Sequence, residues 1–262
     1  TEVGFNGSIL LTERLHGTEQ HLGDNTWQVY PFAPLLARDK VLFYQHNLAP
    51  ETFTLDKATL AWNLALGYML SYDLKASGFG GGVDSPWLRV VSDFQREVLA
   101  HYAQERMLGY TNIQDQVTQT QFEETTVTTN WDATKPYPLP DYTLAPSGFV
   151  VTTTNNSLIA GIFTRYHGAP LSTGDHYLIE TRTATALLLR QSMGEDTDVT
   201  LPLLPRWSQV RTVAVQAFSS NHRLLTSQPA PAQAGQVTFH YQNQQNDQPV
   251  AYYRIVPVIA QR

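Results

Sequence analysis

Four polar side chains, Gln45, His46, Asn47 and Glu51, follow closely on a short apolar run at residues 41–44. Amide, imidazole and carboxylate groups of this kind donate and accept hydrogen bonds, so they can orient a polar ligand. A buried strand that opens into a polar loop and then a helix is the βα unit of α/β proteins, whose sites lie at the carboxyl ends of strands. This loop is therefore the first candidate site.

The elements that must position the loop follow it in the chain. Residues 55–66 form a predicted helix, with Thr54 as its N-cap and Gly67 at its end. The helix is apolar on nearly all sides, so we expect it to be buried. Residues 68–73 are then predicted to form a strand that ends in Asp73.

A second and more regular helix is predicted from Ser85 to about residue 106. Ser85 suits the N-cap, and Pro86 suits the first helical position because its missing N–H has no partner there. Apolar residues recur at spacings of three and four over residues 87–102, as in an amphipathic helix.

Two other segments of the first part of the chain are not expected to form helices. Residues 27–36 are apolar and aromatic, but Pro31 and Pro34 argue against a helix interior. The glycines at 78–82 are not followed by the Lys-Ser/Thr of a phosphate-binding loop, so we interpret them as a flexible loop.

After residue 107 the pattern becomes that of β-structure. The Thr-rich stretch at 116–130 alternates as strands do, and Asn155-Asn156-Ser157 resembles a hairpin turn. Further short β-prone runs are separated by Gly, Pro, Asn and Asp, at 148–154, 158–166, 176–180, 184–190, 210–218, 236–241 and 250–259. Their spacing predicts an antiparallel sandwich.

Composition narrows the class of partner. The 262 residues include 15% charged residues and no cysteine, and the net charge is −6. The net charge is acidic and the sequence has no basic stripe, so nucleic acid is not an expected partner. The sequence also has no run of about 18 apolar residues, so no membrane span is expected. His16 and His21 have the wrong spacing for one helix face, so we expect neither a metal nor a cofactor. Low charge favours, weakly, an extracellular or cell-surface location.

Three stretches together resemble a known family. They are residues 30–46, the segment AWNLALGY at 61–68, and VTTNW at 127–131 followed by YTLAPSGF at 142–149. They resemble the carboxyl-terminal part of a large α/β-barrel glycoside hydrolase, in which a β-sandwich follows the last barrel helix. The resemblance implies an α+β multidomain fold, with a partial (β/α) barrel segment at 1–106 and an antiparallel β-sandwich at 107–262.

This resemblance also implies a chemistry. Glycoside hydrolases flank the scissile bond with two carboxylates, and Glu2 is the better candidate for the general acid/base, with Asp73 a weaker one. Either residue also suits a purely structural role, and the nucleophile is expected outside this chain. An oligo- or polysaccharide would be bound by Trp27, Tyr44, Gln45, His46, Asn47 and Glu51. The partner is expected to be the missing amino-terminal part or another copy of the chain, because two or three βα units cannot close a barrel.

Two alternatives stay open. The first is a non-catalytic extracellular β-rich protein that is structural, filament-forming or sugar-binding; Thr-rich strands and abundant aromatic residues favour it. The second is an amino-terminal-nucleophile hydrolase that uses Thr1, whose own amine would serve as the base. The residues after Thr1 show none of the supporting chemistry.

Overall fold

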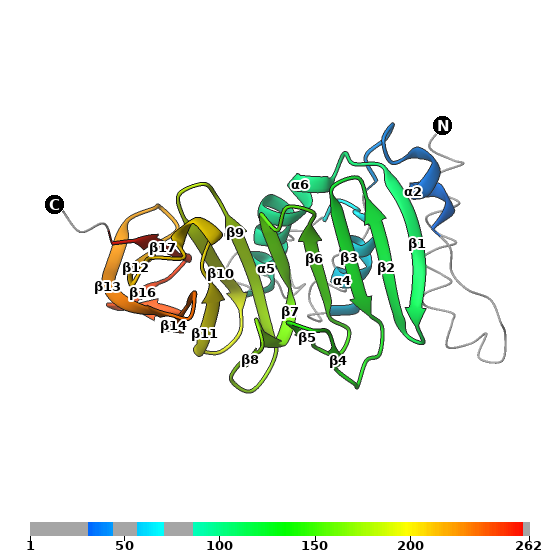
Figure 1. Ribbon diagram of the computed structural model, residues 1–262. Coiled ribbons are helices and arrows are strands. Elements are labelled where there is room, and N and C mark those ends of the chain that lie inside the picture. Colours follow the sequence, from blue (N-terminus) through cyan, green and yellow to red (C-terminus); the bar gives the residue numbers. More distant parts are fainter. Residues whose placement is uncertain (1–30, 44–56, 71–85, 259–262) are drawn as a thin grey trace, which may run out of the picture.

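The fold is mostly β-sheet, with a few short helices packed on one face of a large antiparallel sheet (Figure 1). The computed structural model describes residues 31–43, 57–70 and 86–258. Their helical segments are α2 Phe32–Ala37, α4 Lys57–Leu66, α5 Pro86–Phe94, the π-helical turn Gln95–Leu99, α6 Ala100–Tyr102 and the 3-10 turn Pro205–Trp207. The strands are β1 Met107–Gln114, β2 Val117–Phe122, β3 Thr125–Asn130, β4 Tyr137–Pro138, β5 Thr143–Leu144, β6 Phe149–Thr153, β7 Leu158–Tyr166, β8 Ala169–Pro170, β9 His176–Arg182, β10 Leu187–Met193, β11 Thr197–Pro202, β12 Thr212–Phe218, β13 Leu224–Gln233, β14 Gln236–Tyr241, β15 Gln244–Gln245, β16 Gln248–Pro249 and β17 Tyr252–Pro257.

The main sheet has the strand order β1-β2-β3-β6-β7-β9-β10-β17-β12-β13-β14-β11. Neighbouring strands along this order pair antiparallel, and most are also close in sequence. Strands β17 and β11 are exceptions, because β17 lies between β10 and β12 and β11 pairs with β14. The antiparallel β-structure predicted after residue 107 is therefore confirmed, including the hairpin turn at Asn156, which has a positive φ of 53°.

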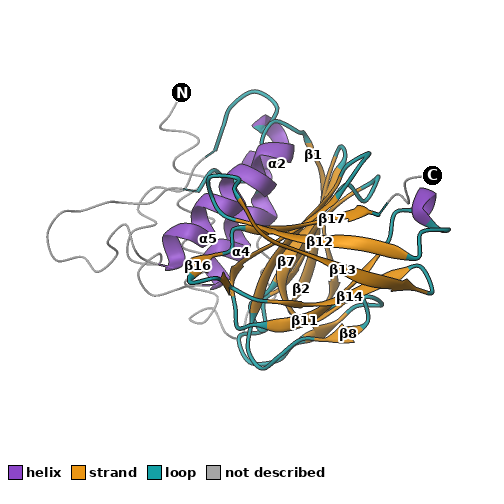
Figure 2. Ribbon diagram, turned by 90° about the vertical axis from the view of Figure 1, so that its left-hand side faces the viewer, coloured by secondary structure: helices purple, strands orange, loops and turns teal. Residues whose placement is uncertain are grey.

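Strand β7 is buried on both faces. Leu158, Ala160 and Ile162 belong to the core that the sheet shares with helices α4 and α5. Ile159 and Phe163 belong to a second core, shared with strands β10 to β14. Successive residues of a strand point to opposite faces, so one continuous apolar run serves both cores. Figure 2 shows the helices lined up along one side of the sheet.

Helix α4 has the buried character that its sequence predicts. Its residues from Leu60 to Leu66 are all buried, and Trp62 contacts Trp131 at a ring-centroid distance of 5.8 Å. The helix ends at Gly67, whose φ of +66° is a conformation that L side chains rarely adopt. The predicted position of the helix end is thus confirmed.

The second predicted helix is also present, with an internal irregularity. Pro86 is the first residue of α5, and Trp87, Val90 and Phe94 pack into the first core. The turn Gln95–Leu99 is π-helical, and the helix ends at Tyr102. It ends earlier than predicted because Met107 already begins strand β1.

The prediction against a helix around Pro34 is wrong. Pro34 is the third residue of α2, and Pro31 precedes the helix as its N-cap. The N–H groups of a first helical turn have no carbonyl partner within the helix, so a proline there removes no hydrogen bond. Only a proline beyond the first turn would have ended this helix.

Strands β1, β11 and β13 were not among the predicted runs. β13 contains Pro229 and Pro231, which face β12. β14 pairs only with the last residues of β13, Ala232 and Gln233. Beside the two prolines, the other edge of β13 therefore pairs with no strand among the described residues. A strand edge without a hydrogen-bonded neighbour tolerates proline.

Candidate functional site

Every side chain that the sequence singled out for chemistry lies outside the described residues. This applies to Thr1 and to the candidate carboxylates Glu2 and Asp73. It also applies to the six expected sugar-binding residues, Trp27, Tyr44, Gln45, His46, Asn47 and Glu51. The structure does describe residues near several of these side chains in the chain, at 31–43 and 57–70.

The segments on either side of helix α4 are hydrogen-bonded to each other. The backbone N–H of Met69 donates to the carbonyl oxygen of Phe43 over 2.8 Å. The rings of Phe43 and Tyr68 stack with their centroids 5.5 Å apart. The residue that precedes the polar loop therefore lies beside the residues that follow the helix.

The π-helical turn holds the second of these segments in place. The backbone N–H of Leu70 donates to Oε1 of Gln95 over 2.8 Å, and Gln95 Nε2 lies 3.3 Å from the sulfur of Met69. π-Helical turns often occur at functional sites. Here the Gln95 amide fixes the backbone three residues before Asp73.

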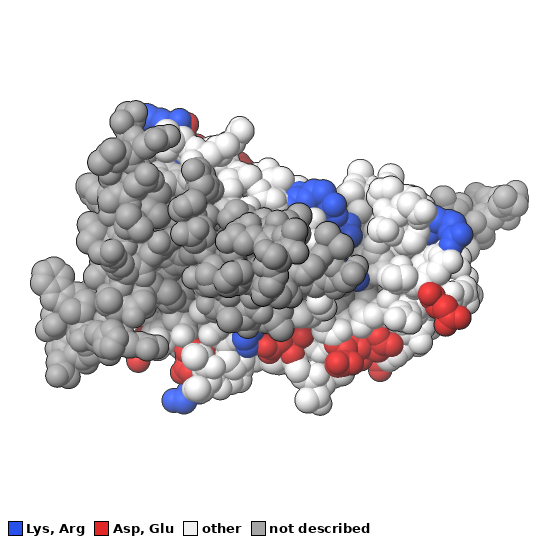
Figure 3. Space-filling view, turned by 180° about the vertical axis from the view of Figure 1, so that it is seen from behind, with Lys and Arg blue, Asp and Glu red and all other residues white. Residues whose placement is uncertain are grey.

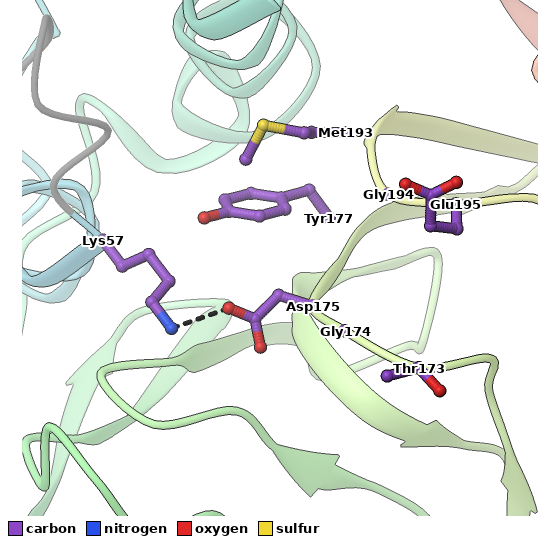
Figure 4. A pocket seen from close by; sticks show the side chains of 8 residues that line it. All are labelled: Lys57, Thr173, Gly174, Asp175, Tyr177, Met193, Gly194 and Glu195. Atoms are coloured by element: carbon purple, nitrogen blue, oxygen red, sulfur yellow. Dashed lines mark hydrogen bonds and ion pairs between the residues drawn. The ribbon is translucent and has the colours of Figure 1, made fainter.

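A hollow of about 450 Å³ opens where the first turn of α4 meets the ends of β9 and β10 (Figure 4). This volume is in the range that binds small molecules. Its lining residues are Lys57, Thr173, Gly174, Asp175, Tyr177, Met193, Gly194 and Glu195. The hollow therefore joins the helix that follows the polar loop to the sheet.

An ion pair crosses the hollow. Nζ of Lys57 lies 2.6 Å from Oδ2 of Asp175, and about a quarter of each side chain is exposed. Glu195 is exposed and makes no ion pair with any residue that the structure describes. The hollow thus carries one cation and two carboxylates, and it has hydrogen-bonding groups for a polar ligand.

The inner wall of the hollow is apolar and closely packed. The ring of Tyr177 is 1% exposed, and it meets Trp87 edge-on at 6.0 Å. Met193 lies beside the same ring (Figure 4). Gly194 has a φ of +138°, and a Cβ there would lie 2.9 Å from Nδ1 of His176. Glycine is therefore required at this point of the wall.

A buried carboxylate lies on the opposite face of β9. Glu180 is fully buried and accepts hydrogen bonds from the Tyr166 hydroxyl and His167 Nε2, both at 2.7 Å, and from Arg182 Nε at 2.5 Å. Burial by itself raises the pKa of Glu180, but His167, Arg182 and Tyr166 outweigh it and hold the pKa below its usual value. This cluster lies within the second core and stabilises the fold.

A further ionic cluster fastens the helices to the sheet. Asp93 in α5 accepts hydrogen bonds from Ser192 Oγ over 2.9 Å and from Arg96 Nη2 over 3.2 Å. Arg190 of β10 and Arg89 of α5 lie 3.6 and 3.7 Å from the same carboxylate. Both of its carboxylate oxygens have partners within the protein, so we assign Asp93 a structural role.

The described residues give no sign of a metal, nucleic-acid or membrane-spanning site. No three of their His, Asp or Glu side chains gather into a metal-binding group. No helix among them is long and apolar enough to cross a membrane. Viewed from behind, acidic side chains gather along the lower border of the molecule, and basic ones lie both beside them and higher up (Figure 3). The described part of this face shows no continuous basic stripe of the kind that binds a phosphate backbone.

Sequence reasoning missed the hollow. Lys57 and Asp175 are 118 residues apart, so no local pattern connects them. A signal did exist: Gly174-Asp175 precedes β9 and Gly194-Glu195 follows β10. The start of one antiparallel strand lies beside the end of its partner, so two such Gly-acid pairs are brought together.

Comparison with known proteins gives no assignment. No protein-family model matches the chain, and no curated protein gives a significant match in sequence.

Proposed function

We propose that this chain is the carboxyl-terminal portion of a carbohydrate-active glycoside hydrolase. Residues 1–106 would supply the last βα units of a (β/α) barrel, and residues 107–262 the β-sandwich behind it. The observation that carries the proposal is the hydrogen bond from Met69 to Phe43 across helix α4. The described residues beside α4 form no strand beyond a single bridge at Met69, and Val41 and Leu42 are exposed, so the buried strand expected at 41–44 is not seen in them. The bond nevertheless joins the two segments that would pair as parallel strands in one βα repeat of such a barrel.

This arrangement gives the polar loop a place. In a parallel βαβ unit the carboxyl ends of both strands lie at one edge, which is where barrel enzymes bind substrate. The loop with Gln45, His46, Asn47 and Glu51 follows one segment, and Asp73 follows the other. One carboxylate and the sugar-binding groups would then face the same ligand.

The hollow supports a polyhydroxylated ligand at this end of α4. Lys57, its ammonium donor, begins the helix six residues after Glu51. Asp175 and Glu195 add carboxylate acceptors from the sheet. Sugar sites use such charged and amide groups to fix the direction of hydroxyls. The hollow would serve as an outer part of the sugar-binding surface.

The proposed reaction is hydrolysis by two carboxylates, which lie about 5 to 9.5 Å apart in such enzymes. Glu2 would act as general acid/base, with Asp73 as the weaker candidate. The nucleophile would lie in the remainder of the barrel, because a closed barrel takes ~200 residues or more. The reaction needs no metal or cofactor. We place the protein outside the cell or at its surface, where polysaccharides are met.

The test is glycosidase activity on aryl glycosides, measured with the remainder of the barrel present. Glu2→Gln and Asp73→Asn each remove one carboxylate at nearly constant size. Loss of a catalytic carboxylate should lower kcat by at least 100-fold. Asp115→Asn is the control, because Asp115 is exposed in the turn between β1 and β2. Wild-type activity in Glu2→Gln would remove Glu2 from the mechanism.

The proposed partner is the amino-terminal part of the barrel. Leu36, Val41 and Leu42 are exposed on the first described segment, and Leu108 and Ile113 are exposed on the edge strand β1. Exposed apolar groups beside a strand edge that pairs with no other described strand favour contact with another polypeptide segment. Native mass measurement on purified material tests this, since the chain alone as a monomer would argue against the partner.

A non-catalytic β-rich protein is the second candidate. It is favoured by the sheet itself, whose two faces are already covered by two cores of this chain. Such a protein would bind oligosaccharide at the hollow or assemble through its strand edges. Saccharide binding by the chain alone, without turnover when the barrel part is added, would favour this function over the hydrolase.

A further inference from the structure

A line of hydrogen-bonded side chains runs beneath the hollow, and one end of it is a carboxylate. Nδ2 of Asn243 donates to Oδ1 of Asp196 and to the carbonyl oxygen of Gly194, both over 2.9 Å. Both partners only accept, so the orientation of the Asn243 amide is fixed. Its Oδ1 therefore accepts from Nε2 of Gln191 at 3.1 Å, and the same Nε2 also donates to the carbonyl oxygen of Glu195 over 2.9 Å.

The fixed amide of Gln191 determines the tautomer of His176. Oε1 of Gln191 lies 2.9 Å from Nδ1 of His176, and this oxygen can only accept. Nδ1 must therefore carry the proton, and a neutral imidazole then has its lone pair on Nε2. That nitrogen lies 3.2 Å from Oγ of Ser172, so the serine hydroxyl can donate to it.

The same imidazole is well placed to hold a second proton. The carbonyl oxygen of Ser172 lies 3.1 Å from Nε2 of His176. If Nε2 gains a proton, that carbonyl can accept it while Nδ1 continues to donate to Gln191. Both N–H groups of an imidazolium therefore have acceptors, although His176 is fully buried.

Ser172 directly precedes a segment that lines the hollow. Its side chain is partly exposed, and the next three residues, Thr173, Gly174 and Asp175, line the hollow. Its backbone N–H donates to Oγ1 of Thr197 over 2.8 Å, which anchors the residue to β11. The hydroxyl thus lies within hydrogen-bonding distance of an imidazole, in the residue that precedes the lining of the hollow.

We propose that Ser172 is an activated nucleophile that takes an acyl group from a carboxylic ester. His176 is its general base, and Gln191, Asn243 and Asp196 are positioning residues. A nucleophile within hydrogen-bonding reach of a base that a third group orients is the signature of nucleophilic catalysis. An amide can take the orienting role, as in the Cys-His-Asn arrangement of some proteases. The proposed acyl transfer uses neither of the proposed glycosidase carboxylates, Glu2 and Asp73.

The step balances with water as the only co-reactant. Ser172 Oγ bonds to the carbonyl carbon of the ester, and its proton passes to Nε2 of His176. The bond from that carbon to the alcohol oxygen then breaks, and the alcohol leaves with the proton. Water repeats the two steps on the seryl ester and releases the carboxylic acid.

The test uses the full chain and a fluorophosphonate probe, with the labelled residue located by peptide mass mapping. The probe reacts with an activated serine. Its fluoride leaves without being protonated, so the rate of labelling reports the attack by the serine alone. Ser172 should be labelled at least 100-fold faster than Ser208, an exposed serine after the 3-10 turn, since a general base contributes about that factor or more. Ser172→Ala should also hydrolyse p-nitrophenyl acetate at least 100-fold more slowly than Ser208→Ala does.

Two further measurements separate activation from simple exposure. His176→Gln should lower the labelling of Ser172 to the rate of Ser208. If that variant does not fold, the wild-type chain in denaturant replaces it, because unfolding removes the base while leaving the hydroxyl accessible. Equal rates at Ser172 and Ser208 in the native chain, or a Ser172 rate unchanged in denaturant, would overturn the proposal.

Discussion

The guanidinium of Arg38 donates from Nη1 to the carbonyl oxygen of Gly67 over 2.5 Å, at the end of helix α4. Its Nη2 donates to the carbonyl oxygen of Tyr102, the last residue of α6, over 2.8 Å. Arg38 is 2% exposed, and its guanidinium lies over the ring of Phe122. One buried cation therefore satisfies carbonyl groups at the carboxyl ends of two helices, where a positive charge is favourable.

Replacing Gly67 by alanine should destabilise the protein more than its backbone conformation alone explains. The positive φ costs about 1–2 kcal/mol for an L residue. In addition, the new Cβ would overlap the Arg38 guanidinium, which cannot move without losing its hydrogen bonds. We expect a total loss of about 3 kcal/mol in the free energy of unfolding, measured by urea titration.

Gly235→Ala is the matched control for this experiment. Gly235 also has a positive φ, +76°, but a Cβ there meets no heavy atom within 4 Å. It should therefore show the backbone cost alone. Equal losses in the two variants would mean that the contact with Arg38 contributes nothing.

Arg38→Met should leave the carbonyl oxygens of Gly67 and Tyr102 without their donor. Each buried acceptor that loses its partner costs about 1–3 kcal/mol, so we expect a loss of about 2 kcal/mol or more. Arg38→Lys should recover part of it, because an ammonium group can still donate but lacks the planar fork. The unfolding temperature should be highest for wild type, lower for Arg38→Lys and lowest for Arg38→Met. An Arg38→Met variant as stable as wild type would contradict this prediction.

Glu180 should make stability fall in acid. Its pKa in the folded protein lies below the ordinary value because His167 and Arg182 favour the carboxylate. A lowered folded pKa gives stability that is fully present above the unfolded pKa of about 4.3 and is lost as pH falls through the folded pKa. Unfolding titrations between pH 7 and pH 3 should therefore show a decline below about pH 5.

Glu180→Gln should remove the part of this decline that Glu180 causes. It should also cost about 3 kcal/mol at pH 7, because Arg182 and His167 would lose a buried partner. Glu195→Gln, in an exposed side chain, controls for the loss of one negative charge. An acid decline of unchanged size in Glu180→Gln would show that other carboxylates are responsible.

The ion pair across the hollow should matter for ligand binding more than for stability. Lys57 and Asp175 are partly exposed, and such pairs contribute less than about 1 kcal/mol. The free energy of unfolding of Asp175→Asn should therefore differ from that of wild type by less than about 1 kcal/mol. If the hollow binds saccharide, the same variant should weaken oligosaccharide binding about tenfold in calorimetry, and Asp198→Asn, an exposed carboxylate on β11, should not.

The sequence predicted those elements whose pattern is local. Helix α4 is recognisable from its apolar residues and from Gly67, and the strands of β2, β3, β6, β7 and β9 from alternation and turns. Pro34 and β13 were missed for a different reason. A proline is harmful only where the backbone N–H is needed, and whether it is needed depends on helix position or on the neighbouring strand.

The site could be predicted even less completely. Lys57, Asp175 and Glu195 come together only because α4 packs against the ends of β9 and β10. The hydrogen bonds that fix the tautomer of His176 depend on Asn243, 67 positions away in the numbering of the chain. Contacts of this separation follow from strand order, which no short sequence window contains.

The position of β17 has a consequence for synthesis. Residues 187–189 and 213–218 lie on either side of it, and both pair with Tyr252–Pro257 rather than with each other. While the ribosome is still holding residue 257, strands β10 and β12 have an open seam between them. Strands that precede β10 can form hairpins as they emerge. The second core stays incomplete until β17 leaves the ribosome and pairs with β10 and β12. Nascent chains stalled before residue 252 should therefore be cut by protease within β10 to β14, and chains released after residue 258 should resist.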